Sequence, residues 1–204
     1  MHQNDLARIE KFIINHRADL QQNKLVPVYE DIFNTTHSSA DCARFTVLLY
    51  EKGIDAYDYV GETLPPGIYA ESWVKVSPKL CSGKVLNFSN SRIKYIGEEA
   101  FGGQHFEIAD LSGVEVLPEY LFVDCYPLRK IILDCKSVKS CPRTLGALVY
   151  NCPQLEEIEL KDIKTHRPCE ALEEFCWNTD NFYGGALNKK GYVKLTWEGK
   201  DDEF

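Results

Sequence analysis

The stretch of sequence that decides the fold reads VEVLPEYLFVDCYPLRKIIL and runs from Val114 to Leu133. It ends in Ile131-Ile132-Leu133, where apolar residues stand on both sides of a single position. Such alternation is typical of a short strand that turns every second side chain inward. Four other places have the same form: Leu86-Asn87-Phe88, Ala109-Asp110-Leu111, Ile158-Glu159-Leu160 and Val193-Lys194-Leu195. We therefore expect five short strands.

The expected strands recur at a fairly regular distance. The steps between them are 23, 22, 27 and 35 residues, and a period of about 20–29 residues is typical of stacked repeat units. Other positions recur as well, because Cys125 and Leu128 precede one strand and Cys152 and Leu155 precede the next. The last step is longer and leaves room for a helix at Cys169–Cys176. These regularities predict a repeat fold.

The full pattern of the unit is Val114-x-x-Leu117-Pro118-x-x-Leu121-Phe122-x-x-Cys125-x-x-Leu128-x-x-Ile131-x-Leu133. It resembles the BspA-like class of leucine-rich repeats, whose pattern runs I-x-x-I-G-x-x-A-F-x-x-C-x-x-L-x-x-I-x-L. The stretch Ile93–Phe101 is similar to the first half of that pattern. The resemblance covers residues 64–160, about half of the chain, and implies an α/β fold, a short right-handed leucine-rich-repeat solenoid of few, irregular repeats. It also implies a bacterial or phage protein. The chain departs from the family pattern at several places: Gln104 replaces the first unit's cysteine, Cys141 replaces an isoleucine, and residues 142–148 include extra positions. Because the repeats are this irregular, no binding specificity is carried over.

The regions on either side of the repeats are expected to be caps. Residues 1–63 read as a helical N-terminal cap, since Asn4 or Asp5 can cap a helix in which Leu6, Ile9, Ile13 and Leu20 recur at helical spacing. Residues 161–204 read as a C-terminal cap that contains the last strand. Short helices bury little surface alone, so we expect both caps to pack on the repeats within a single domain.

Composition and charge exclude several classes of function. The chain has 204 residues and a formal net charge of −8, with balances of −4, −2 and −2 over residues 1–63, 64–160 and 161–204. No basic cluster marks a nucleic-acid site, and no apolar run approaches the roughly 20 residues of a membrane span. Charged residues are spread through the N-terminal segment, which leaves no room for the apolar core of a signal peptide. We expect a cytoplasmic protein that binds neither nucleic acid nor membrane.

The eight cysteines are the unusual feature of the composition. Cys125, Cys141 and Cys152 fall on apolar positions of the repeats, which indicates reduced packing residues. A disulfide is one alternative, although it requires an oxidising compartment. A zinc site at His166, Cys169 and Cys176 is another, but the chain has no Cys-x-x-Cys pair of the kind on which structural zinc sites rely. We expect no metal and no cofactor.

Motifs that mark common enzymes are missing from the sequence. There is no Gly-x-Ser-x-Gly elbow, His-Glu-x-x-His pair, Walker loop or Gly-x-Gly-x-x-Gly turn. Adjacent carboxylates such as Glu156-Glu157 point apart on a strand, so they do not form an acid and base pair. We predict that the protein is not an enzyme. The alternative is a thiol-dependent enzyme that uses His166, Cys169 or Cys176 in a C-terminal cleft.

The residues between the apolar positions of successive strands are expected to line one continuous face. They are Asn87, Asp110, Ile132, Glu159 and Lys194, with Lys130 and Glu157 beside them. Ile132 stands out because a solvated position rarely carries a branched hydrophobe, so either a loop covers it or it anchors a protein contact. We predict a non-catalytic protein-binding module, one version of which is a phage inhibitor of a host defence enzyme. A structural or assembly factor that self-associates through this face, as a homo-oligomer, is the alternative.

Overall fold

A computed structural model describes residues 79–163, 167–177 and 193–197, together with short pieces at 11, 14–15, 56–57, 62–64, 67, 69 and 75–76. Most of the predicted N-terminal cap at 1–63 lies outside the described residues, as do His166 and the side chain of Cys176. The predicted boundaries between the caps and the repeats therefore stay predictions.

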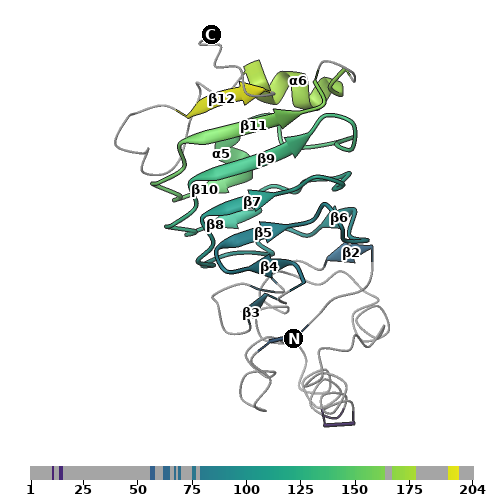
Figure 1. Cartoon of the computed structure of the whole chain (residues 1–204), viewed down its shortest axis with the longest axis vertical. Coiled ribbons are helices and arrows are strands. Elements are labelled where there is room, and N and C mark those ends of the chain that lie inside the picture. The colour runs from purple at the N-terminus through teal and green to yellow at the C-terminus, as the bar shows by residue number, and fades with distance from the viewer. Residues whose placement is uncertain are drawn as a thin grey trace.

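The largest element is a six-stranded sheet (Figure 1) with the strand order β12-β11-β9-β7-β5-β4. Its strands are β4 (Cys81–Ser82), β5 (Val85–Asn87), β7 (Ile108–Asp110), β9 (Lys130–Asp134), β11 (Glu157–Lys161) and β12 (Lys194–Trp197). Neighbouring strands from β5 to β12 run parallel, whereas β4 pairs antiparallel with β5. The sheet is therefore mixed.

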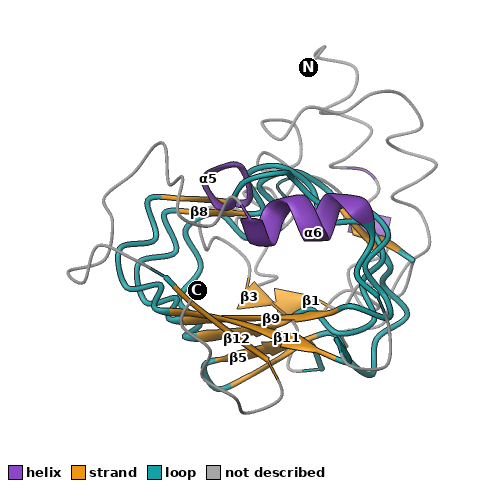
Figure 2. Ribbon diagram, turned by 90° about the horizontal axis from the view of Figure 1, so that it is seen from above, coloured by secondary structure: helices purple, strands orange, loops and turns teal. Residues whose placement is uncertain are grey.

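Smaller elements connect these strands. Three two-stranded parallel sheets pair β1 (Ala56–Tyr57) with β3 (Lys75–Val76), β2 (Thr63–Leu64) with β6 (Tyr95–Ile96), and β8 (Phe122–Val123) with β10 (Val149–Tyr150). The helices are α5 (Leu145–Leu148) and α6 (Glu170–Trp177). Viewed from above, α5 and β8 lie on the opposite side of the molecule from β5, β9, β11 and β12 (Figure 2).

The strands expected from the alternating residues are present, and four of the five have the expected register. Leu86, Ala109, Ile131 and Ile158 are aligned across β5, β7, β9 and β11, and all four are fully buried. The fifth strand is shifted by two residues, because Leu195 rather than Val193 pairs with Ile158. The helix expected at Cys169–Cys176 is confirmed by α6.

The predicted fold class is wrong. The described residues form a small, mostly sheet α/β-type fold with a mixed six-stranded sheet and two short helices, and they show no leucine-rich-repeat solenoid with a helical cap. Apolar alternation determines where strands form and which side chains they bury, but it does not determine how the chain travels between them. Here the chain between strands forms two-residue strands and a four-residue helix, and β4 folds back on β5.

The antiparallel strand depends on a tight turn at Gly83. Its φ of +61° lies in the left-handed region, which glycine adopts without a steric penalty. The turn joins Ser82 to Val85, which pair across the hairpin. The sequence prediction missed this strand because Cys81-Ser82 carries no apolar alternation.

The core lies between the large sheet and the segments opposite it. Phe101 is fully buried at its centre, with ring centroids 5.8–6.1 Å from those of four neighbours: Tyr69, Phe88, Phe106 and Phe122. Edge-to-face and stacked contacts of this kind add about 0.5–1.5 kcal/mol per pair beyond the burial of area. This packing anchors the inner side of the sheet to the segments opposite it.

Candidate functional site

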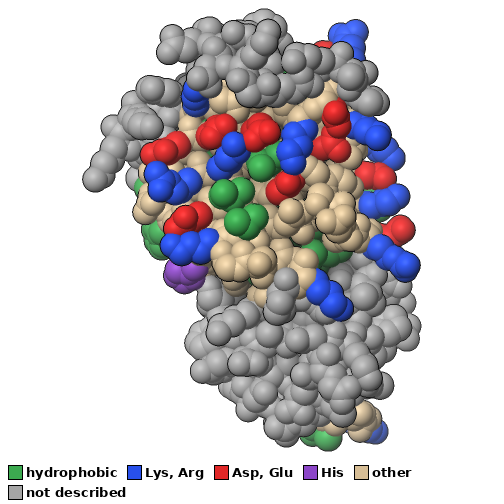
Figure 3. Space-filling model, viewed as in Figure 1, with side chains coloured by type: hydrophobic (Ala, Val, Ile, Leu, Met, Phe, Trp, Pro, Cys, Tyr) green, Lys and Arg blue, Asp and Glu red, His purple; other side chains and the backbone are tan. Residues whose placement is uncertain are grey.

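The solvent side of the large sheet, which we call the outer face, is formed by alternate residues of β5, β7, β9, β11 and β12. Two rows cross it in register. One row holds Asn87, Asp110, Ile132, Glu159 and Thr196, and the other holds Val85, Ile108, Lys130, Glu157 and Lys194. Acidic and basic side chains alternate over this face, and hydrophobic side chains lie between them (Figure 3). The outer face is thus a mixed surface.

Lys130 lies at the centre of one ion-pair network. Its Nζ is 3.0 Å from Oε1 of Glu157 and 2.7 Å from Oε2 of Glu159, on the neighbouring strand β11. Partial burial opposes the charge of Lys130, but the two carboxylates outweigh it and raise the pKa of the lysine. Thr196 adds a hydrogen bond of 2.8 Å from its hydroxyl to Glu157. The network therefore joins β9, β11 and β12.

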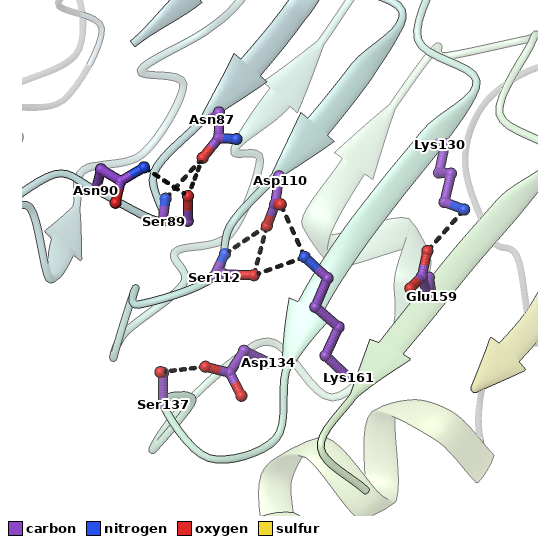
Figure 4. Close-up of polar contacts among 10 residues, drawn as sticks. All are labelled: Asn87, Ser89, Asn90, Asp110, Ser112, Lys130, Asp134, Ser137, Glu159 and Lys161. Carbon is purple, nitrogen blue, oxygen red and sulfur yellow. Dashed lines mark hydrogen bonds and ion pairs between the residues drawn. The ribbon is translucent and has the colours of Figure 1, made fainter. Parts of the chain in front are cut away.

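A second network joins strands that are not neighbours. Nζ of Lys161, at the end of β11, is 2.9 Å from Oδ2 of Asp110 on β7, so the lysine side chain crosses the intervening strand β9 (Figure 4). Ser112 donates a hydrogen bond of 2.5 Å to Oδ1 of the same aspartate. Burial disfavours the charged form of Asp110, yet the hydrogen bonds from Ser112 and Lys161 hold its pKa below the usual value.

The ends of three strands share one kind of turn. In it, a side-chain oxygen accepts a hydrogen bond from the backbone amide of the residue two positions later. Asn87 accepts from Ser89 at 2.8 Å, Asp110 from Ser112 at 3.0 Å, and Asp134 from Lys136 at 2.9 Å. Such turns are typical of Asn and Asp. These three polar residues therefore end strands, and this structural role explains why they stand there (Figure 4).

Hydrophobic side chains occupy the middle of the outer face. Ile132 lies in the row between Asp110 and Glu159, and it is half-buried. Ile108 and Val85, which are half-buried as well, continue from it towards β5. The described residues thus leave part of three branched aliphatic side chains exposed beside the ion pairs. Such an arrangement is what the core of a protein interface requires.

All seven residues predicted for this face lie on the outer side of the sheet. Asn87, Ile132 and Glu159 are half-buried, and Asp110 is more buried than predicted at 8% exposed, because Ser112 and Lys161 cover it. Lys194 is opposite Glu157 rather than Glu159, so Thr196 occupies the row position expected for the lysine.

Sequence reasoning missed four side chains of the face: Val85, Ile108, Lys161 and Thr196. The first three stand two positions from Asn87, Asp110 and Glu159, so the period of two along a strand would have found them.

The three cysteines that the sequence predicts as packing residues, Cys125, Cys141 and Cys152, are buried. The cysteines that the structure describes form no disulfide. Sγ of Cys125 is 2.9 Å from the carbonyl oxygen of Phe101, and Sγ of Cys152 is 3.6 Å from that of Phe122. Gln104, which stands at the corresponding earlier position, donates instead to the carbonyl of Tyr69. These side chains therefore satisfy carbonyl groups of the preceding segment.

The zinc alternative gains no support from the part of the chain that the structure describes. No group of three or more His, Cys, Asp or Glu side chains there is arranged to hold a metal ion. Cys169 is half-buried, and its predicted partner His166 lies outside the described residues. None of the described helices has the length and the apolar character needed to cross a membrane.

Comparisons with protein-family models, with curated proteins and with solved structures gave no match to this chain. The resemblance to BspA-like repeats therefore stays a prediction from the sequence.

Proposed function

We propose that the chain is a non-catalytic module that binds another protein through the outer face of its large sheet. The observation that carries this proposal is Ile132, a branched aliphatic side chain that is half-exposed between Asp110 and Glu159 on the sheet. A hydrophobic centre surrounded by charged side chains is typical of protein interfaces. Ile108 and Val85 extend that centre over two more strands.

The charges of the face indicate which partner it suits. Asp110, Glu157 and Glu159 are all paired with Lys130 or Lys161, so the face offers little unbalanced charge. A strongly charged partner would have to break these pairs and would leave their carboxylates or lysines without a counter-ion. The proposed partner is therefore a protein surface with an apolar side chain at its centre and few net charges around it.

We place this binding in the cytoplasm of a bacterial cell. The described cysteines form no disulfide, which suits a reducing compartment. The resemblance of residues 64–160 to BspA-like repeats indicates a bacterial or phage protein, and one form of the proposed activity is the binding and modulation of a host protein.

The test compares two lysine substitutions of equal charge. Ile132→Lys places a long, cationic side chain at the proposed centre, where Asp110 and Glu159 accommodate its charge. Gln154→Lys makes the same charge change at an exposed residue between β10 and β11. Tagged forms of the wild type and of both variants are used to capture protein from a bacterial lysate. A protein held by the wild type and by Gln154→Lys, but released by Ile132→Lys, supports the proposal.

Two results would contradict it. Capture that survives Ile132→Lys would show that the outer face is not the docking surface. Sedimentation measures the oligomeric state of the purified chain and of its variant. A wild-type dimer that Ile132→Lys converts to a monomer would establish self-association in place of a foreign partner.

A further inference from the structure

A second surface lies on the side opposite the outer face, where β8, β10 and α5 run (Figure 2). Three of its tyrosines are exposed: Tyr120 by 42%, Tyr126 by 51% and Tyr150 by 44%. Large aromatic side chains are usually buried, and exposed tyrosines are enriched where proteins bind one another. We call this region the tyrosine surface.

Backbone hydrogen bonds place acidic residues next to these tyrosines. The amide of Glu99 donates to the carbonyl of Tyr120 at 3.1 Å, so the two residues are neighbours on adjacent segments. The amide of Asp124 donates to the carbonyl of Tyr150 at 3.0 Å. The hydroxyl of Tyr126 also lies 3.4 Å from the carboxylate of Asp124. An acidic residue therefore lies on the segment next to Tyr120 and to Tyr150, and Tyr126 has a carboxylate beside its hydroxyl.

The charge of this surface is unbalanced. Its three segments, 97–105, 118–127 and 142–154, contain four acidic residues: Glu98, Glu99, Glu119 and Asp124. They contain one basic residue, Arg143, which pairs with Glu174 at 3.4 Å. Among the residues that the structure describes, no ion pair joins Glu98, Glu99 or Glu119 to a lysine or arginine. The outer face differs in this respect, because lysines neutralise its carboxylates.

We propose that the tyrosine surface binds an arginine-bearing segment of another protein. A guanidinium group stacks on the face of a tyrosine ring and pairs with a carboxylate at the same time, which an ammonium group does less well. Tyr126 has the carboxylate of Asp124 beside it, and Tyr120 lies next to the segment that carries Glu99, so the surface offers rings and carboxylates close to one another. An acidic or neutral segment would leave the carboxylates without partners. This binding is separate from that proposed for the outer face.

The experiment measures the fluorescence anisotropy of a labelled nonapeptide in which arginine and serine alternate. Tyr120→Ser/Tyr150→Ser removes two rings, and Glu99→Gln/Glu119→Gln removes two charges. The matched controls are Tyr95→Ser, at a tyrosine that is 39% exposed on β6, and Glu62→Gln/Glu170→Gln, at two exposed glutamates elsewhere. We expect each test variant to raise the Kd for the peptide by about tenfold. Each control variant should change the Kd by less than about twofold.

Three outcomes would overturn the proposal. Absence of saturable binding by the wild type would show that the surface has no such ligand. Equal weakening by both pairs of glutamate variants would mean that the peptide responds to net charge alone. Full retention of affinity in Tyr120→Ser/Tyr150→Ser would show that the rings take no part. Circular dichroism checks that each variant folds, and Tyr120→Phe/Tyr150→Phe, which keeps both rings, is expected to bind as the wild type does.

Discussion

Ile131 and Ile132 are adjacent and chemically identical, yet they lie on opposite faces of the same strand. Ile131 is fully buried in a row with Ala109 and Ile158, whereas Ile132 is half-exposed in a row with Asp110 and Glu159. The inner face is held together by apolar packing, and the outer face by ion pairs and turns. The pleat alone therefore buries one isoleucine in the core and leaves the other half-exposed on the outer face.

The largest effect is expected when the inner face receives a charge. Ile131→Lys would bury an ammonium group with no counter-ion in the row that Leu86 and Ile158 share, at a cost of about 3–5 kcal/mol or more. That cost is similar to the whole stability of a small domain. We expect the variant to be unfolded by circular dichroism at room temperature. A folded variant would show that the inner row is not the core.

The buried thiols test the inner side of the fold in a second way. Burial, with smaller contributions from Asp134 and Asp162, raises the pKa of Cys135 to about 11, which lowers its thiolate fraction at neutral pH about a hundredfold. Burial likewise raises the pKa of Cys125. We expect alkylation by N-ethylmaleimide, followed by mass spectrometry, to label these two thiols only when the protein is unfolded. A single fast-reacting thiol whose replacement spares the fold would favour the thiol-enzyme alternative.

Loss of the lysine that crosses β9 should have a moderate effect. Lys161→Ala removes the ion-pair partner of Asp110, whose carboxylate is only 11% exposed. Lys161 itself is 38% exposed, so solvent screens the pair, and we expect a loss of about 1–2 kcal/mol in the free energy of unfolding. Urea denaturation measures it. In Lys161→Ala/Asp110→Asn the loss should be smaller than in Lys161→Ala alone, because no buried charge is left; an equal loss would contradict the pairing.

A smaller effect is expected from acid. The folded-state pKa of Asp110 is lowered, so its contribution to stability is present above the unfolded-state pKa of about 4 and is lost as the pH falls through the folded value. The free energy of unfolding of the wild type should therefore decrease from about pH 4 downward. Asp110→Asn should show a shallower decrease, because the contribution of Asp110 is missing. Some decrease should remain, because the pKa values of Glu107, Glu115 and Glu157 are also lowered. Identical slopes would show that Asp110 is not linked to folding.

The smallest effect on stability is expected from Ile132→Lys. The new ammonium group would lie between Asp110 and Glu159 at the surface, so the melting temperature should change by no more than about 2 °C. Differential scanning calorimetry measures it against Ile131→Lys, the same substitution one residue earlier. A large fall in the melting temperature would mean that Ile132 belongs to the core and not to a binding surface.

Much of the sheet could be predicted from the sequence, and the reason is its period of two. Alternation identified four strands with the correct inward residues, and all seven predicted surface residues lie on the outer side. The expected register of β12 was wrong by two residues. Val193 and Leu195 flank Lys194, and the alternation does not decide which of the two lies opposite Ile158. It also failed for the fold class, since the pattern says nothing about the chain between strands.

The polar contacts of the outer face could not be predicted from the sequence for a different reason. Lys161 and Asp110 are 51 residues apart in the chain, and they meet only because a long side chain spans an intervening strand. No local pattern encodes such a contact. The turns at Asn87 and Asp110, in contrast, are local, and each has a serine two residues on that the sequence displays.

The short strand β4 affects how molecules of this protein meet at high concentration. An unpaired sheet edge acts as a template on which strands of other molecules add, and a long, flat, hydrophobic edge strand is the most prone to it. At this end of the described sheet β4 has only two residues, Cys81 and Ser82. Very short edge strands are one of the ways in which proteins limit such pairing. The hairpin therefore offers a strand from a second molecule little ladder to continue.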